Sequence, residues 1–343
     1  MMRILNLFFV ILLIFLLYRC APQKEEKFTK HEEAIQIVEK TSKTEIIDLS
    51  ISPLNTIQGH YGYIYYFDIS PDGKTMASGG SDKNIKLWDI SNLPEIKEIK
   101  SIKRLYSQLW GPPVKFSEDG NYIFSGSYDF IEVFDKNLNY IANLRISDKG
   151  VQSIEVEDNK IFASDVNGFV YKISFDGKKL NLEDKKQVHN EEIWKIKASE
   201  DGKYLITASV DKTSKVLDTK SLNEIATLRA HAGPLEFVSV SKDKIALFSA
   251  DSHISIWDYN FNLLGKIYDS DKKDIIVGKF SKSGKYIISG GKSYKIKIWN
   301  VENMQLEKTL EWHKNDIMAI ILSIDNKYII SGDRDGKIAI WRF

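Results

Sequence analysis

Residues His313–Phe343 read HKNDIMAIILSIDNKYIISGDRDGKIAIWRF, and this stretch decides the fold. Runs rich in apolar residues occupy 317–324, 327–332 and 337–343, and Asp, Asn and Gly cluster between these runs. β-Branched and aromatic runs broken by such clusters predict three antiparallel strands joined by tight turns. A three-stranded unit cannot bury its own apolar faces, so neighbouring units have to cover it.

Copies of the unit recur along the chain. The segment SGDRDGKIAIW has counterparts in SGGSDKNIKLW (78–88) and SGGKSYKIKIW (289–299), and a looser one in FSADSHISIW (248–257). The third strands end at 88, 134, 173, 217, 257, 299 and 341. A second marker stands near the repeat starts, at His60, His189, His231 and His313, with Asp271 in the same register. A period of about 40–45 residues with four strands per unit is typical of propeller blades.

The repeats resemble those of WD40 proteins from about residue 53 to residue 343. The resemblance implies an all-β, seven-bladed propeller, and we assign residues 50–343 to it. The segment PLNTIQGH (53–60) has the form of a fourth strand followed by a repeat-start His, but no blade precedes it. We therefore predict that this N-terminal strand completes the last blade and removes an exposed sheet edge. The least regular stretch, 175–187, is expected to be an extended loop.

Residues 1–20, MMRILNLFFVILLIFLLYRC, are expected to be a signal peptide or membrane anchor. The apolar run from Ile4 to Tyr18 would span about 22 Å as a helix, against about 30 Å of hydrocarbon core, which favours a signal peptide. Cys20, the only cysteine, follows directly and resembles the lipid-attachment site of bacterial lipoproteins, although Arg19 departs from that pattern. We expect lipidation at Cys20 and an extracytoplasmic, membrane-associated lipoprotein. An uncleaved signal anchor is the alternative. Residues 21–49 are expected to form a polar tether, helical in part.

Charge argues against a nucleic-acid partner. Lys and Arg number 48 against 47 Asp and Glu, and the two signs are interleaved along the chain. Nucleic-acid binding would favour a basic stripe. We expect a monomeric propeller with a protein or peptide partner.

Polar residues recur at blade spacing. In WD40 proteins such positions form a hydrogen-bonded chain inside a blade, which implies structural roles here for two sets: His60, Ser78, Asp82 and Trp88, and His313, Ser331, Asp335 and Trp341. A catalytic triad would occur once, whereas this set is repeated. No catalytic residue, metal site or cofactor is therefore expected, and no phosphate-binding loop or nucleophile motif is present.

The resemblance also implies a binding face around the channel, with contacts three and five residues after the repeat-start position and just before the turn Asp. Aromatic residues, Met and Arg are enriched at interface hot spots. We predict partner-binding roles for Tyr63, Tyr65, Trp110, Trp194, Met318 and Arg334. The same positions in other blades include Pro112, Gln152, Glu236, Asp274 and Ile276.

The sequence therefore favours a non-catalytic, membrane-tethered scaffold that binds a protein or peptide on the face around the channel. One alternative is a propeller enzyme with an unrecognised site in the channel. Another is a scaffold on a signal anchor that faces the cytoplasm.

Overall fold

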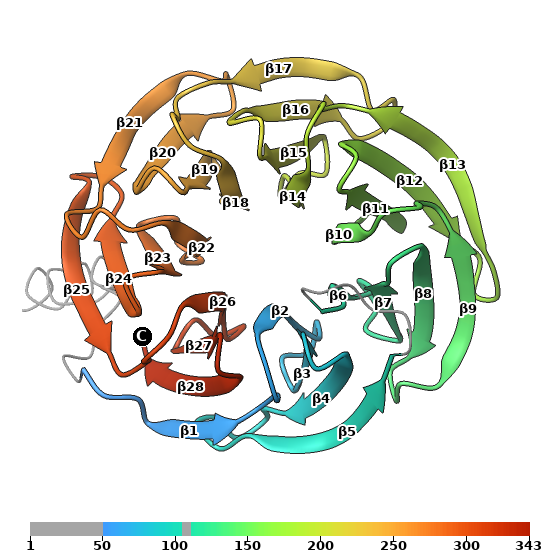
Figure 1. Cartoon of the computed structure of the whole chain (residues 1–343), viewed down its shortest axis with the longest axis horizontal. Helices are drawn as coiled ribbons and strands as arrows, with labels where there is room; N and C mark the ends of the chain where they lie inside the picture. Colours follow the sequence, from blue (N-terminus) through green and yellow to red (C-terminus); the bar gives the residue numbers. More distant parts are fainter. Residues whose placement is uncertain (1–50, 105–110) are drawn as a thin grey trace, which may run out of the picture. The chain divides into compact units, whose positions relative to one another are not determined.

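The computed structural model describes residues 51–104 and 111–343. These residues form seven four-stranded antiparallel sheets, the blades, arranged around a central channel in chain order (Figure 1). The predicted fold is confirmed. The predicted segments 1–20 and 21–49, with Cys20, lie outside the described residues.

Each blade runs from an inner strand at the channel to an outer strand at the circumference. Blade one holds β2 (Ile64–Ile69), β3 (Thr75–Gly80), β4 (Asn84–Asp89) and β5 (Lys97–Lys103). Blade two holds β6 (Val114–Phe116), β7 (Tyr122–Gly126), β8 (Phe130–Asp135) and β9 (Tyr140–Arg145). Blade three holds β10 (Val151–Glu157), β11 (Lys160–Asp165), β12 (Phe169–Phe175) and β13 (Leu180–Gln187). Blade four holds β14 (Ile193–Ala198), β15 (Tyr204–Ser209), β16 (Ser214–Asp218) and β17 (Glu224–Leu228).

Blade five holds β18 (Leu235–Val240), β19 (Lys244–Ser249), β20 (His253–Asp258) and β21 (Leu263–Tyr268). Blade six holds β22 (Ile275–Phe280), β23 (Tyr286–Gly291), β24 (Lys295–Asn300) and β25 (Gln305–Glu311). Blade seven holds β26 (Ile317–Leu322), β27 (Tyr328–Asp333) and β28 (Lys337–Arg342), together with β1 (Asn55–Gln58).

Burial explains why the strands of one blade differ in composition. The second strand β27, YIISGD, is buried at every position but its first, because the adjacent blades cover both of its faces. The outer strand β25, QLEKTLE, exposes its Gln, its first Leu and both of its Glu side chains. Apolar runs therefore mark the interior strands, and alternating charged residues mark the circumference.

The predicted closure is confirmed. Strand β1 pairs antiparallel with β28, in a register from Asn55 opposite Ile340 to Gln58 opposite Lys337. The Gly59 N–H also donates to the Gly336 carbonyl at 2.8 Å. Gly336 has a φ of 79°, and a Cβ there would lie 2.0 Å from the His60 carbonyl oxygen. This turn accepts only glycine, because both its conformation and its clearance exclude a side chain.

The core lies between blades rather than inside one sheet. At the closure, Ile64, Met76 and Trp88 of blade one pack against Ile330 and Ile340 of blade seven. All five side chains are buried, and each contributes about 1.5–3 kcal/mol of hydrophobic stabilisation. The ring is held together at this junction by the same kind of packing as elsewhere.

The expected loop at 175–187 is wrong. Strands β12 and β13 pair through this stretch, from Phe175 opposite Leu180 to Phe169 opposite Gln187. The turn is closed by Asp176, whose carboxylate accepts the backbone N–H groups of Lys178 and Lys179 at 2.9 and 2.8 Å. β13 is an outer strand with mostly exposed, charged side chains, so it lacks the apolar alternation that predicts a strand.

Candidate functional site at the channel mouth

A backbone irregularity builds the channel mouth. Six of the seven inner strands shift register after their first residue, as between Ile64 and Tyr66 or between Ile193 and Lys195. Such a bulge leaves one extra residue unpaired and re-aims its side chain. The extra residues are Tyr65, Gln152, Trp194, Glu236, Ile276 and Met318.

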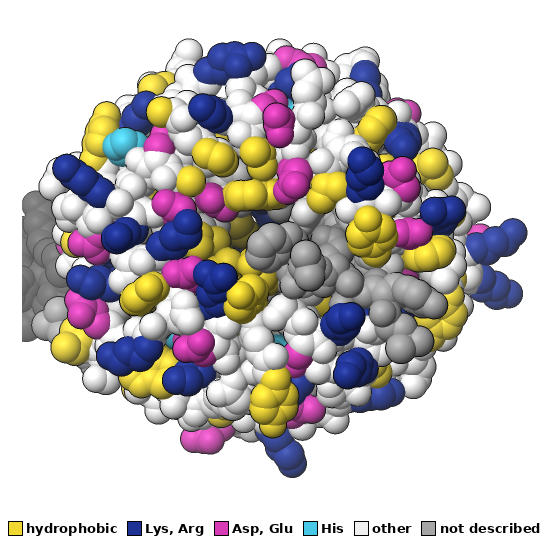
Figure 2. All heavy atoms as spheres, in the orientation of Figure 1, with side chains coloured by type: hydrophobic (Ala, Val, Ile, Leu, Met, Phe, Trp, Pro, Cys, Tyr) yellow, Lys and Arg dark blue, Asp and Glu magenta, His cyan; other side chains and the backbone are white. Residues whose placement is uncertain are grey.

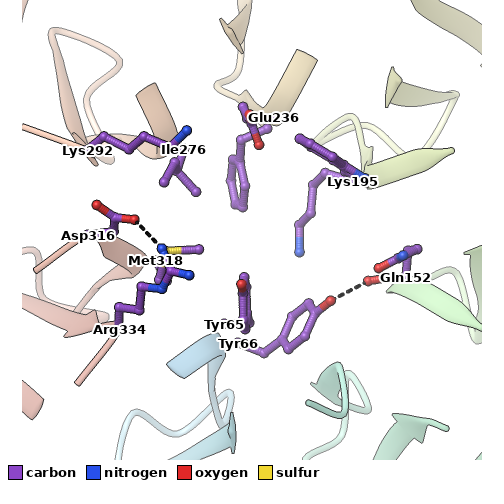
Figure 3. A pocket seen from close by; sticks show the side chains of 12 residues that line it. Tyr65, Tyr66, Gln152, Lys195, Glu236, Ile276, Lys292, Asp316, Met318 and Arg334 are labelled. Carbon is purple, nitrogen blue, oxygen red and sulfur yellow. Dashed lines mark hydrogen bonds and ion pairs between the residues drawn. The ribbon is translucent and has the colours of Figure 1, made fainter. Parts of the chain in front are cut away.

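All six extra residues line one cavity of about 260 Å³ at the centre of the ring (Figure 3). The rest of its lining is Tyr66, Lys195, Phe237, Lys292, Asp316 and Arg334. Hydrophobic side chains and charged side chains of both signs gather around the centre of this face (Figure 2). The cavity thus combines an aromatic and aliphatic interior with a charged rim.

The rim between blades seven and one is held by Arg334. Its guanidinium donates to the Asp316 carboxylate at 3.1 Å and to the Tyr63 hydroxyl at 3.0 Å. The guanidinium carbon also lies 4.6 Å from the centre of the Tyr63 ring, and the Tyr63 and Tyr65 rings meet edge to face at 5.9 Å. Arg334 is therefore positioned before any partner arrives, which reduces the entropic cost of binding.

Blades three to five supply a second cluster of contacts. The Trp194 indole N–H donates to the Glu192 carboxylate at 2.6 Å, and the Tyr66 hydroxyl donates to the Gln152 carbonyl at 2.7 Å. The Lys195 ammonium extends toward the channel centre, 5.9 Å from the Tyr66 ring and 5.1 Å from the Phe237 ring (Figure 3). Its charge is thus presented between two aromatic faces.

Glu236 lines this cavity, and its carboxyl group has a raised pKa. Burial, followed by the nearby Asp274 carboxylate, raises the pKa of Glu236 to about 8, although the Lys292 ammonium opposes the shift. At neutral pH this carboxyl is therefore mostly protonated and can donate a hydrogen bond. The mouth therefore carries less negative charge at neutral pH than its Asp and Glu residues alone indicate.

Glu236→Gln is expected to flatten the dependence of stability on pH. The carboxyl has an ordinary pKa of 4.5 and a folded-state pKa of about 8, so its stabilising effect is complete below the lower value and is lost as the pH rises through the higher one. Thermal melts between about pH 5 and about pH 9 should show a steeper fall in Tm for the wild type than for the variant. The exposed Glu302→Gln should keep the wild-type slope. A wild-type slope in Glu236→Gln would contradict the raised pKa.

Five of the six residues predicted to bind a partner gather at this mouth. Tyr65, Trp194, Met318 and Arg334 line the cavity, and Tyr63 contacts Arg334. Trp110 lies outside the described residues. The sequence prediction missed Tyr66, Lys195 and Phe237, because strict alternation along a strand sends the residue after a lining residue to the other face. Only the bulge brings both residues to the cavity, and no turn residue in the sequence marks it.

The polar sets form chains of hydrogen bonds within blades. In blade one, the Trp88 indole donates to the Ser78 hydroxyl at 2.8 Å, Ser78 and His60 Nε2 lie 2.7 Å apart, and His60 Nδ1 lies 2.9 Å from Asp82. Ser78 can donate to Nε2 while Nδ1–H donates to the carboxylate, so every polar atom has a partner. Both ring nitrogens of His60 are engaged, which leaves neither of them for a ligand.

Blade seven departs from the predicted set at one residue. Trp341 donates to Ser331 at 2.9 Å and Ser331 meets His313 at 2.7 Å, but His313 Nδ1 pairs with Asp333 at 2.7 Å. The prediction for Asp335 is wrong. Asp335 is exposed and accepts from the Asn315 side chain. Asp333 occupies the position of Gly80 in blade one. From that position its carboxylate, and not that of Asp335, contacts His313.

In blades three and six, other residues take the place of the repeat-start histidine. In blade three the Asp165 carboxylate accepts from Ser147 at 2.8 Å and from Tyr171 at 2.7 Å. In blade six the buried Lys297 ammonium pairs with Asp269 and, at 2.7 Å, with Asp271. Within the described part of the chain, no group of three or more His, Cys, Asp and Glu side chains is arranged to hold a metal ion.

The family model for the WD domain, G-beta repeat (WD40) matches residues 51–89, 183–218, 270–300 and 304–342. A relative from Neurospora crassa, eukaryotic translation initiation factor 3 subunit I, is 32% identical over 211 residues, which are 56% of this chain and 58% of the relative. The protein of that name from Candida albicans is 28% identical over 222 residues, 56% of this chain and 60% of its own length. Autophagy-related protein 16 of Arabidopsis thaliana is 22% identical over 255 residues, 70% of this chain and 48% of its own length.

The chain thus spans about 58–60% of the length of the initiation-factor relatives that it matches. These relatives are named for initiation and autophagy and not for a catalysed reaction, in agreement with the expectation of a non-catalytic protein. The expected extracytoplasmic, lipoprotein-type location is wrong. Similarity to subunits of a translation initiation factor points away from such a lipoprotein.

Residues 51–104 and 111–343 contain no helix long and apolar enough to cross a membrane. Several observations support the same architecture: the four-stranded blades, the ring closure by β1, the hydrogen-bonded chains and the family match at four repeats. Residues 51–104 and 111–343 form a seven-bladed β-propeller that contains WD40 repeats.

Proposed function

We propose that this propeller is a non-catalytic scaffold that binds a protein or peptide partner at the channel mouth. The single observation that carries the proposal is the cavity of about 260 Å³ where Tyr65, Trp194, Ile276 and Met318 converge from four blades. Tyr, Trp and Met are residue types enriched at the buried centres of interfaces.

The charges at the rim support a macromolecular partner. Arg334 is paired with Asp316, and Lys292 is paired with Asp274, so the rim presents neutralised pairs around an apolar centre. Interfaces commonly have this arrangement of apolar core and polar rim. A partner would place an apolar or aromatic side chain in the cavity and hydrogen-bond to the rim.

The relatives give the proposal a context. Those named as subunits of translation initiation factor 3 are, by that name, parts of a larger factor. By analogy, we look for this chain's partner among proteins with which it forms a stable assembly. Their names do not identify the partner.

Trp194→Ala is expected to weaken partner binding by about 2 kcal/mol, or roughly 30-fold, with little loss of stability. Trp194 is only partly buried and lies at the edge of its blade, so its truncation opens no sealed core. The measurement is affinity purification of the tagged chain from its own cells, with co-purifying proteins quantified, alongside thermal melts. Tyr65→Ala should remove the same proteins.

The matched control is Tyr140→Ala, which truncates an exposed aromatic residue on the outer strand β9. It should retain every co-purifying protein. If the two mouth variants retain them as well, or if they melt far below the wild type, the mouth is not the binding site and its aromatic residues serve packing.

A further inference from the structure

Below the mouth, a second cavity of about 60 Å³ lies within the channel. Tyr65, Tyr66, Lys195 and Phe237 line both cavities, so Lys195 faces the mouth and the channel at once. The charged residues around the lower cavity are Asp68, Lys115, Glu155, Lys195, Lys197 and Lys279. Four ammonium groups therefore face two carboxylates.

These charges are only partly compensated. Lys115 lies 3.1 Å from Asp68 and 3.8 Å from Glu155, and Lys197 pairs with Glu155. The two carboxylates are thus shared by two lysines of blades two and four. The ion pairs form an alternating row, Asp68–Lys115–Glu155–Lys197, which follows the channel wall through four consecutive blades.

Lys195 and Lys279 take no part in this row of ion pairs. Among the described residues neither has a hydrogen bond or ion pair to an acidic side chain, and residues 105–110, LYSQLW, contain no Asp or Glu. The Lys195 ammonium instead lies over the rings of Tyr66 and Phe237. An ammonium group removed from bulk water without a counter-charge is costly, so the site favours an anion.

We propose that the channel binds one small oxyanion of the phosphate or sulfate class between Lys195 and Lys279, with Lys115 and Lys197 contributing to its field. Two unpaired ammonium groups match a divalent anion in charge, and lysine binds phosphate groups as a point charge. Access is through the mouth, past Tyr65 and Tyr66. The inference stands independently of the protein partner proposed above.

The lowered pKa values of Lys195 and Lys279 agree with this geometry. Burial lowers the pKa of Lys279 to about 7, with Lys197 and Lys115 adding to the effect, and burial lowers the pKa of Lys195 to about 8. The titratable groups that line the lower cavity with them are Tyr65, Tyr66 and Asp68 on β2, Lys115 on β6, Glu155 on β10, and Lys197 on β14. No Asp, Glu, Lys or Arg from β18 or β26 lines this cavity. A bound anion favours the protonated lysines, so binding takes up protons.

The test is equilibrium dialysis of the full chain with radiolabelled sulfate at constant ionic strength. We expect one saturable sulfate per chain, displaced by inorganic phosphate but not by chloride. Lys279→Gln and Lys195→Gln should each weaken it at least about tenfold, as expected when a charge-assisted contact worth about 1.4 kcal/mol or more is lost. Lys178→Gln, on the exposed turn before β13, is the matched control and should bind as the wild type does.

Sulfate keeps its charge between about pH 6 and about pH 9, so its affinity should fall about tenfold or more over that range as the two lysines lose protons. Thermal melts in sulfate provide a second readout, in which the increment in Tm should saturate and be smaller in Lys279→Gln. Sulfate also stabilises proteins generally by exclusion from their surface. An equal, non-saturating increment in wild type and variants, or sulfate binding unaffected by both substitutions, would overturn the proposal.

Discussion

Replacing residues 53–58 with a six-residue Gly/Ser segment should lower the Tm of this propeller by roughly 10 °C, the equivalent of about 3–5 kcal/mol. The replacement removes β1, whose four residues pair with β28 and whose Ile57 packs against the cluster between blades one and seven. Without it, β28 becomes an unpaired edge in the last blade, and the covalent link across the ring junction loses its strand. Circular dichroism melts and light scattering would measure both the destabilisation and the aggregation that an exposed edge promotes.

A replacement of equal length tests the role of β1 more clearly than a deletion does. If 53–58 were simply deleted, residues 47–52, IDLSIS, could move into the vacant register with their own alternating apolar residues. The control replaces six residues within 24–40, a segment outside the described part of the chain. Equal melting temperatures for the two proteins would show that β1 contributes nothing to closure.

Asp333→Ala should cost about 3–5 kcal/mol, whereas Asp335→Ala should cost less than about 0.5 kcal/mol. The Asp333 carboxylate is fully buried, and it accepts from His313 at 2.7 Å and from the backbone N–H groups of Asp335 and Lys337 at 3.0 and 2.9 Å. Its removal leaves three buried or partly buried donors unpaired, and each such donor carries a desolvation penalty.

The two residues belong to one turn, DRDG, and differ by two positions, so they form a matched pair. Urea unfolding of both variants, monitored by tryptophan fluorescence, gives the difference in midpoint directly. Asp333→Asn should recover part of the loss, because its amide oxygen still accepts a hydrogen bond. A larger effect at Asp335 would restore the assignment made from repeat alignment and contradict the observed geometry.

The fold was predictable because its determinants are local and repeated. Alternating runs, turn residues and a period of about 40–45 residues define blades without any knowledge of contacts. Closure by residues 53–58 followed from the segment PLNTIQGH (53–60), which has the form of a fourth strand and a repeat-start His but follows no blade of its own. The choice of Asp333 over Asp335 did not follow, because both carboxylates lie in one turn and only its three-dimensional course decides which one reaches His313.

The mouth was predictable in part for the same reason. Counting from the repeat start finds Trp194 and Met318, whereas the bulges that add Tyr66 and Lys195 are a property of strand pairing. The channel charges did carry a usable signal. Asp68 and Lys197 each lie eight residues after a repeat-start histidine, so aligning that position across blades would have shown a charged layer. Which lysines remain unpaired in it depends on side-chain positions.

The pairing of β1 with β28 also fixes an order of events on the ribosome. Asn55 and its partner Ile340 are separated by about 280 residues, so the strand made first has no partner until nearly the whole propeller has emerged. At 5–20 residues per second this wait lasts on the order of half a minute. During translation, blades one to six can complete their own hairpins while β1 stays unpaired, and the ring locks only when synthesis reaches the last repeat.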